Sequence, residues 1–442
     1  MEELPLGMIA KWILQTYPMY LIHFLFWIIM LLVFSQYNKM VKRERELFGT
    51  AKNNPLRQTL ISTGFGFLAG IMASFIIIIL GINLMAVGVV YVLPFVILMM
   101  LIHPRYMCFA YGGGIVGLLS LSLSALSNVW PVLNEISFLQ GLMAINVPGL
   151  ISLIAILHLT EAVLILFSGA IGSSPLYVKH ETKGIVGGFS LQKFWPLPFV
   201  GLISQPPGEN GAQAAETAIS MPEWWPIFGS GLEEMAGGLA MFPVVAVLGY
   251  GDISVSTPPG QKSKEAGKNL ALYSIVLLGV ALAAAFYLPL AWLSALLSPV
   301  GHEIMIIKGK SKEFSREPIY YDNNKGIKIL DIYPDGIASN MGLKPGDRIH
   351  LINHFPVSTE EDFRTMLYSG QPHLRLDIER ENGERKVLQA PIHDDKTRFG
   401  VILAPGVNKT RSRYMELAEN DGLKALSKRF KFFGRLFKRN RS

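Results

Sequence analysis

The sequence predicts an α-helical polytopic membrane domain over residues 1–305, a small α/β (mainly β) domain over residues 306–404, and a basic amphipathic helix in the tail, residues 405–442. Half of the 442 residues are hydrophobic and the mean hydropathy is +0.36, which is too apolar for a soluble globular protein of this size. Long apolar runs fill the chain before residue 308, and polar and charged residues follow. The chain therefore divides into a membrane part and a small soluble part.

The first apolar run is expected to remain as a membrane span. Residues 1–20 lack the basic start of a signal peptide, and no small-residue cleavage site follows the run. The chain has one cysteine, Cys108, which argues against a disulfide framework and against a Cys-based metal site. No metal and no cofactor is expected.

The first half of the membrane domain is expected to place the N-terminus outside. Residues 2–15 mix charged and apolar side chains and are expected in the membrane interface. Basic residues from Lys39 to Arg57 follow the first span, so the positive-inside rule makes this loop cytoplasmic. A turn at Gly81-Ile82-Asn83 closes a helical hairpin. The expected spans are residues 17–34, 60–80, 84–102 and 109–126.

The second half is expected to contain a cytoplasmic β-hairpin within residues 173–198, because apolar pairs flank a charged turn there. The Pro-broken stretch up to Ser204 is expected to be a half-span, and Pro289 is expected to divide a long apolar run. The predicted crossings are residues 149–170, 224–248 and two within 270–307. The count is about nine, with seven or eight left open, and the charges place the soluble domain inside.

Two polar residues, His158 and Glu161, lie three positions apart on one face of an expected span. A carboxylate within the membrane is a functional hypothesis by default, because burying it is costly. The pair would be a proton or ion relay in a transporter. The simpler interpretation is a helix–helix hydrogen bond inside the bundle.

The segment from Gly326 to Asp347, GIKILDIYPDGIASNMGLKPGD, predicts a strand, a tight turn, a short helical turn and a second turn. Together with the following INHFPVSTEEDF it resembles the PDZ domain of bacterial membrane and envelope proteins. That resemblance implies a groove between a strand and a helix, which accepts an extended peptide as an added strand.

The resemblance places a peptide-binding groove on the strand at residues 327–332 and on a helix at residues 360–368. The loop before the strand would offer its amides to a peptide carboxylate, although it lacks the glycine pattern of eukaryotic PDZ domains. The alternative is that the apolar members are only core. The expected groove residues are Asn324, Lys325, Gly326, Ile327, Ile329, Phe363 and Leu367.

The tail has aromatic residues at helical spacing with cations between them, which is typical of a helix lying on an anionic membrane surface. Each cation near such a surface contributes about 1 kcal/mol. A solvated tail is the alternative, and no nucleic-acid partner is expected. The expected lipid-binding residues are Lys428, Arg429, Phe430, Phe433, Arg435 and Phe437.

A PDZ-like domain on a membrane protein raises the possibility of an intramembrane protease. Such metalloproteases use H-E-x-x-H, in which two His four residues apart hold zinc. His302-Glu303 supplies only the first half, and Ile306 occupies the position of the second His. We therefore expect no catalytic residues, and the chain contains no G-x-S-x-G motif of a serine hydrolase.

The layout resembles the MinJ-type division-site proteins of Gram-positive, endospore-forming bacteria. The matching features are an outer N-terminus, a first span followed by VKRERELF at residues 41–48, a polytopic middle and a C-terminal PDZ-like domain. The resemblance implies a non-enzymatic adaptor in the plasma membrane, linking a polar scaffold to the inhibitor of Z-ring assembly. Two alternatives stay open: an accessory or degenerate relative of a PDZ-containing intramembrane protease, and a transporter with a regulatory PDZ domain. A homo-oligomer also stays open.

Overall fold

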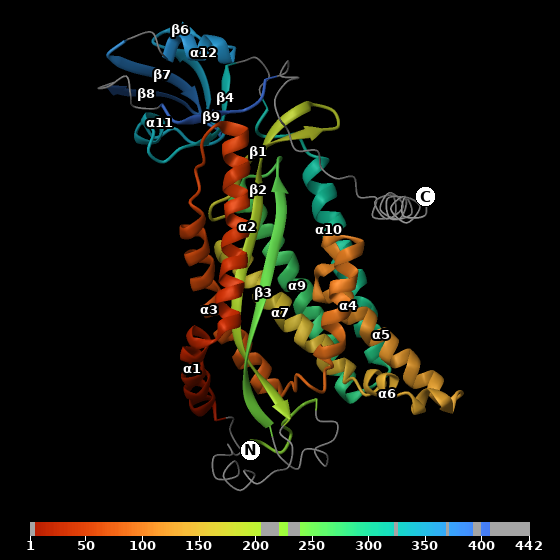
Figure 1. Cartoon of the computed structure of the whole chain (residues 1–442). Coiled ribbons are helices and arrows are strands. Elements are labelled where there is room, and N and C mark those ends of the chain that lie inside the picture. The colour runs from red at the N-terminus through yellow and green to blue at the C-terminus, as the bar shows by residue number, and fades with distance from the viewer. Residues whose placement is uncertain are drawn as a thin grey trace, which may run out of the picture.

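The structure, a computed structural model, describes residues 5–204, 221–228, 239–321, 326–367, 371–391 and 399–406. An elongated body of helices carries a small β-rich domain at one end, which we name the β-domain end (Figure 1). Six helices in the described ranges are long and apolar enough to cross a membrane. They are α2 (Phe24–Phe48), α3 (Pro55–Leu80), α5 (Phe109–Ser127), α7 (Val147–Ser168), α9 (Pro259–Phe286) and α10 (Leu290–Phe314). The chain is a multi-pass membrane protein with a mainly β domain, as the sequence predicts.

The N-terminal segment is a helix of its own, α1 (Leu6–Ile22), which ends where His23 caps α2 through its ring nitrogen. Ile9 and Ile13 are fully buried against α3 and β2. The expected boundary, an interfacial segment followed by a span at residues 17–34, is therefore wrong. Apolar periodicity continues through residues 17–34, but the chain breaks at His23, which has an extended backbone.

Helix α4 (Val89–Ile102) corresponds to the expected span at residues 84–102, and it is too short to be one. Its 14 residues rise about 21 Å, whereas the hydrocarbon layer is about 30 Å thick. A 3₁₀ turn, η1 (Pro104–Met107), connects α4 to α5. The apex of this hairpin reaches His158 of α7 and His302 of α10. The elements η2 (Pro131–Glu135) and α6 (Ser137–Met143) then lead to the buried central helix α7.

A β-hairpin follows α7, as the sequence predicts. It consists of β1 (Ser174–His180) and β2 (Gly184–Ser204), and β2 continues through the body far beyond β1. Strand β3 (Leu239–Ser254) pairs with β2 in antiparallel register from Ser204↔Leu239 to Phe189↔Ser254. Figure 1 shows the long pair running between the helices. The expected helical crossing at residues 224–248 and the half-span before Ser204 are therefore wrong, because both regions contribute strands.

A strand inside a membrane body must satisfy its unpaired edge, because lipid offers no hydrogen bonds. The helices supply hydroxyl groups to this edge of β2. Tyr37 of α2 accepts the Phe194 amide at 3.1 Å, and Ser74 of α3 accepts the Val200 amide at 2.8 Å. Tyr17 of α1 donates to the carbonyl of Pro198 at 2.9 Å. The hydroxyl groups therefore replace the strand that β2 lacks here.

Two prolines and two glycines let α3 lie directly on this edge. Pro196 and Pro198 have no N–H group and so leave no donor unpaired. A Cβ atom on Gly66 would overlap the carbonyl oxygen of Pro196, and one on Gly70 would overlap that of Pro198. The Gly-x-x-x-Gly spacing of α3 thus matches the Pro-x-Pro spacing of β2.

The β-rich domain is a sheet of strand order β8-β7-β5-β4-β9, with β6 paired to β5. Its hydrophobic core is separate from that of the helical body. The strand at residues 327–332 and the helix near residues 360–368 agree with the sequence prediction. The elements are β4 (Ile327–Ile332), α11 (Ile337–Asn340), β5 (Arg348–Ile352), β6 (Phe355–Pro356), α12 (Glu360–Leu367), β7 (His373–Glu379), β8 (Arg385–Pro391) and β9 (Val401–Leu403).

Candidate functional site

Strand β4 has no free edge at which a peptide could be added. Its start pairs with β5 and its end pairs with β9. Ile327 and Ile329 are buried in the core of the domain. Their burial and the paired edges of β4 favour the core alternative for these two residues. Sequence reasoning missed β9, which lies about 70 residues after β4 in the chain.

The outer edge of β9 lies next to the membrane domain. On the inner edge of β9, the carbonyl of Gly400 accepts from the amide of Tyr333, just after β4, and the amide of Ala404 donates to the carbonyl of Lys328 in β4. Because bonding direction alternates along a strand, Leu403 directs its main chain to the opposite edge. There the hydroxyl of Tyr177, on β1, donates to the Leu403 carbonyl at 3.0 Å. A side chain of the membrane domain thus occupies the edge where a ligand strand would bind.

Helix α12 and strand β9 both carry partly exposed apolar side chains. Phe363 of α12 and Phe399 are buried with ring centroids 5.8 Å apart, which holds the helix beside the start of β9. Leu367, Val401 and Leu403 pack on the core while remaining partly exposed. Of the other expected groove residues, Gly326 precedes β4 with a φ of 112°, and Asn324 and Lys325 lie outside the described residues.

The β-rich domain rests on the membrane domain through a cluster of aromatic and aliphatic side chains, which we name the docking cluster. The hydroxyl of Tyr333 donates to the carbonyl of Thr50, between α2 and α3. The amide of Gly187 on β2 donates to the carbonyl of Tyr320 at 2.8 Å. The docking cluster comprises Tyr177, Phe189, Tyr320, Leu330, Tyr333, Ile402 and Ala404.

An ion pair joins the two domains beside the docking cluster. The ammonium of Lys52 lies 2.8 Å from both carboxylate oxygens of Asp331, whose side chain is 1% exposed. Burial raises the pKa of Asp331 above its usual range, and Lys52 offsets part of that effect. The buried Glu44 carboxylate accepts from the amides of Lys52 and Asn53 and thereby fixes the loop that presents Lys52.

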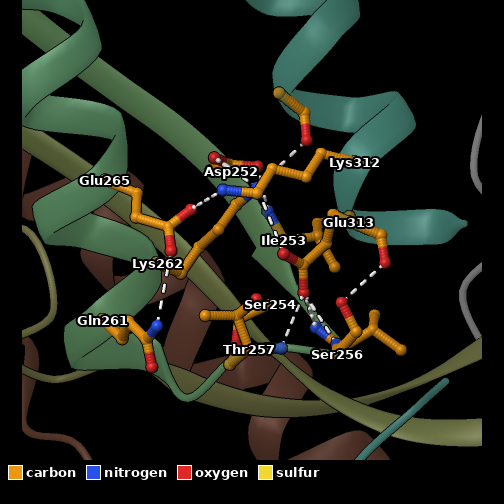
Figure 2. Close-up of polar contacts among 12 residues, drawn as sticks. Asp252, Ile253, Ser254, Ser256, Thr257, Gln261, Lys262, Glu265, Lys312 and Glu313 are labelled. Carbon is orange, nitrogen blue, oxygen red and sulfur yellow. Dashed lines mark hydrogen bonds and ion pairs between the residues drawn. The ribbon is translucent and has the colours of Figure 1, made fainter. Parts of the chain in front are cut away.

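The last turn of α10 is fixed by a polar cluster immediately before the linker to the β-rich domain (Figure 2). One carboxylate oxygen of Glu313 accepts the amides of Val255, Ser256 and Thr257 at 2.7–3.0 Å. The ammonium of Lys262 lies 3.4 Å from the carboxylates of both Glu313 and Asp252. Three elements, β3, α9 and α10, are therefore tied together where the chain leaves the membrane domain.

The intramembrane pair His158 and Glu161 lies on the central helix α7, as expected. His158 directs Nδ1 to the carbonyl of Ile154 at 2.8 Å and Nε2 to Cys108 at 3.1 Å. Its contact across the helices thus involves Cys108, and Glu161 lies three residues further along α7, partly exposed. A relay or a structural hydrogen bond for this pair stays a prediction. The lipid-binding residues expected in the tail lie outside the described residues.

Comparison with known proteins identifies a relative that matches most of the chain. The chain is 23% identical over 395 residues to "Cell division topological determinant MinJ" of Bacillus subtilis (strain 168), covering 88% of this chain and 94% of that protein. The match includes parts of both the membrane domain and the β-rich domain, because each is longer than the unmatched remainder. The resemblance to MinJ-type proteins is confirmed. No family model and no solved structure matches the chain.

Proposed function

We propose that this MinJ-type chain is a membrane-anchored adaptor that helps to place the cell-division site. The observation that carries the proposal is the similarity to a cell-division topological determinant over most of both chains. The architecture supports it, because a small domain with a strand edge and partly exposed apolar side chains on α12 and β9 is held at one end of a membrane body. The adaptor would bind division proteins, namely a polar scaffold and an inhibitor of Z-ring assembly, as the family resemblance implies.

Partner segments would bind by adding a strand to the outer edge of β9. Main-chain hydrogen bonds would go to Val401 and Leu403, and an apolar side chain of the partner would lie against Leu367. The partner would have to displace the hydroxyl of Tyr177 from Leu403. This geometry replaces the groove on β4 that the sequence predicts.

The β-domain end would face the cytoplasm. Basic residues gather at this end of the body, on α2 and on the first turns of α9 and the last turns of α10, which favours the inside by the positive-inside rule. The basic tail would then lie on the inner membrane surface and bind anionic lipid. The basic residues are Lys39, Lys42, Arg43 and Arg45, then Lys262, Lys264 and Lys268, then Lys308, Lys310 and Lys312.

The test combines the position of a fluorescent fusion with recovery of its partners. The unaltered chain should form septal or polar foci. Leu367→Asp places a carboxylate where an apolar partner side chain would lie, and such a burial costs several kcal/mol, so partner recovery should fall about a hundredfold. Glu384→Lys, on the exposed turn between β7 and β8, is the control. Uniform membrane signal, or unchanged recovery with a folded Leu367→Asp chain, would refute the proposal.

A further inference from the structure

Three potential metal ligands from three different helices meet inside the membrane domain. Cys108 lies at the start of α5, His158 in the middle of α7 and His302 in the middle of α10. Their ligand atoms all lie within 4.8 Å of one another. Both histidines are buried, and Cys108 is partly buried. Since they are far apart in sequence, only the tertiary fold brings them together.

The hydrogen bonding of His158 leaves its inward nitrogen ready to bind a cation. Nδ1 lies 2.8 Å from the carbonyl oxygen of Ile154, which can only accept, so Nδ1 carries the proton. Nε2 therefore points its lone pair toward Cys108, at 3.1 Å. Metal-ligating histidines are typically oriented in this way, with the second ring nitrogen donating to a carbonyl or carboxylate.

His302 has no strong hydrogen bond that would explain its buried ring. Its Nδ1 has no hydrogen-bond partner among the described residues. Its Nε2 lies 3.8 Å from the sulfur of Cys108, which is too long for a strong hydrogen bond. Its Nε2, which faces the cluster, therefore lacks a strong partner in the part of the chain that the structure describes. A cation between Nε2 and the sulfur would supply one.

The distances fit the coordination of a d¹⁰ metal ion. With a metal–sulfur bond of about 2.3 Å and metal–nitrogen bonds of about 2.05 Å, a tetrahedral angle places sulfur and nitrogen about 3.6 Å apart. The two observed separations, 3.1 and 3.8 Å, lie on either side of this value. One thiolate and two imidazoles are ligands that suit Zn²⁺ and Cu⁺, and not Mg²⁺ or Ca²⁺.

The neighbouring polar groups indicate a structural role. Glu303, next to His302 in the chain, is held by Arg105 at 2.7 Å and by the hydroxyl of Tyr111. Its carboxylate is thus engaged elsewhere and does not compete for the cation. A bound ion would join the apex of the α4–α5 hairpin to α7 and α10.

We propose that Cys108, His158 and His302 form a binding site for a d¹⁰ transition-metal ion, Zn²⁺ or Cu⁺, which joins the short hairpin to the two long helices. The sequence alone argues against such a site because a single cysteine cannot form one. The structure adds the two histidines from other helices. The His302-Glu303 pair, which lacks a second His on its own helix, finds that second ligand in His158.

The test measures metal bound to the full-length chain, purified in detergent without a histidine tag and without chelators. Samples are dialysed against Zn²⁺ or, under anaerobic conditions, against chelator-buffered Cu⁺, and bound metal is measured by mass spectrometry. About one ion per chain is expected, and the two arms identify which ion binds. Cobalt-loaded chain should show a thiolate-to-cobalt charge-transfer band.

Conservative variants separate binding from folding. Cys108→Ser keeps an oxygen that can cap the Ala110 amide, so the fold should persist while the band and most of the metal are lost. His302→Asn should also lose the metal. His350→Asn, which alters a histidine paired with Glu379 in the β-rich domain, should retain it. The proposal would be overturned if the unaltered chain bound neither ion. It would also be overturned if the Cys108→Ser and His302→Asn variants bound as much metal as the unaltered chain.

Discussion

Replacing Lys52 with methionine removes the cation that faces Asp331 while keeping most of the aliphatic length of the side chain. The amide of Lys52, which donates to Glu44, is unchanged, so the loop keeps its main-chain support. The substitution therefore isolates the ion pair between the domains. We expect the β-rich domain to lose its fixed position on the membrane domain while both domains stay folded.

The size of the effect follows from the burial of Asp331. Removing one partner of a buried ion pair costs about 3–5 kcal/mol. The side chain of Lys52 is 29% exposed, which lowers this figure. Without Lys52, the buried carboxyl of Asp331 can instead take up a proton. For a carboxyl with an ordinary pKa near 3.9, protonation at pH 7 costs about 4 kcal/mol, which is an upper limit on the loss of docking free energy. Docking should weaken by about 2–4 kcal/mol, or roughly 30-fold to 1,000-fold.

The pH dependence gives an independent check. Burial in the docked state raises the pKa of Asp331, so the docked state binds a proton more readily than the undocked state. Docking is therefore favoured at low pH and weakens as pH rises through the raised pKa. Because Lys52 offsets part of the shift, the dependence should be steeper in the Lys52→Met chain, and acidification should restore docking.

Spin labels at two exposed sites measure docking directly. One label replaces Glu181 in the β1–β2 turn and the other replaces Glu384 in the β7–β8 turn, in a Cys108→Ser background. The unaltered interface should give one narrow distance distribution, and Lys52→Met a broad one at pH 7.5. Lys344→Met, at an exposed lysine of the β-rich domain, is the control. A narrow distribution that persists in Lys52→Met would refute this account of docking.

Three further outcomes are expected. Gly70→Ile should reduce accumulation of the chain by forcing α3 from Pro198 of β2, a cost of at least about 1–3 kcal/mol, whereas Gly64→Ile, at an open position, should accumulate normally in membrane fractions. Glu313→Gln should weaken the contacts that join β3, α9 and α10 by about 2 kcal/mol and speed hydrogen exchange at residues 255–257. Glu265→Gln, which alters the ion pair with Lys312, should leave that exchange unchanged. Equal exchange rates in the two variants would contradict the role given to Glu313. A cysteine at Glu135 should react with an impermeant thiol reagent in intact cells and one at Glu181 only after permeabilisation, and the reverse pattern would contradict the orientation.

Local features of the fold could be predicted from the sequence because their causes are local. Pro289 divides the last apolar run, and the charged turn at residues 181–183 closes the β1–β2 hairpin. Gly and Pro set the turns around β4. In each case a few neighbouring residues determine the backbone, so a single sequence is sufficient.

The long β2–β3 pair could not be predicted, because its apolar stretches match a buried helix as well as a buried strand. Pro196 and Pro198 argue against a helix at that position, yet they also fit a short, broken span. The choice between strand and helix here depends on how these prolines fit against Gly66 and Gly70 of α3, which lie more than a hundred residues earlier in the chain. That fit is a tertiary property.

The proposed peptide-binding edge and metal site likewise depend on contacts between residues that are far apart in the sequence. The sequence predicts α12 with its residues Phe363 and Leu367, but it does not predict the contact of Phe363 with Phe399, two residues before β9. Likewise His158, His302 and the lone cysteine each have an ordinary local interpretation. Their proximity depends on the hairpin of α4 and α5, in which α4 is too short to cross a membrane.

Docking and partner binding would compete for one main-chain group. The carbonyl of Leu403 accepts from Tyr177 in the docked state, and an added strand along β9 would need the same carbonyl. Any free energy that holds the β-rich domain on the membrane domain must then be overcome when a partner binds, and a bound partner must weaken docking to the same extent. An adaptor built in this way would release its domain only for partners that bind more strongly than its own membrane domain does.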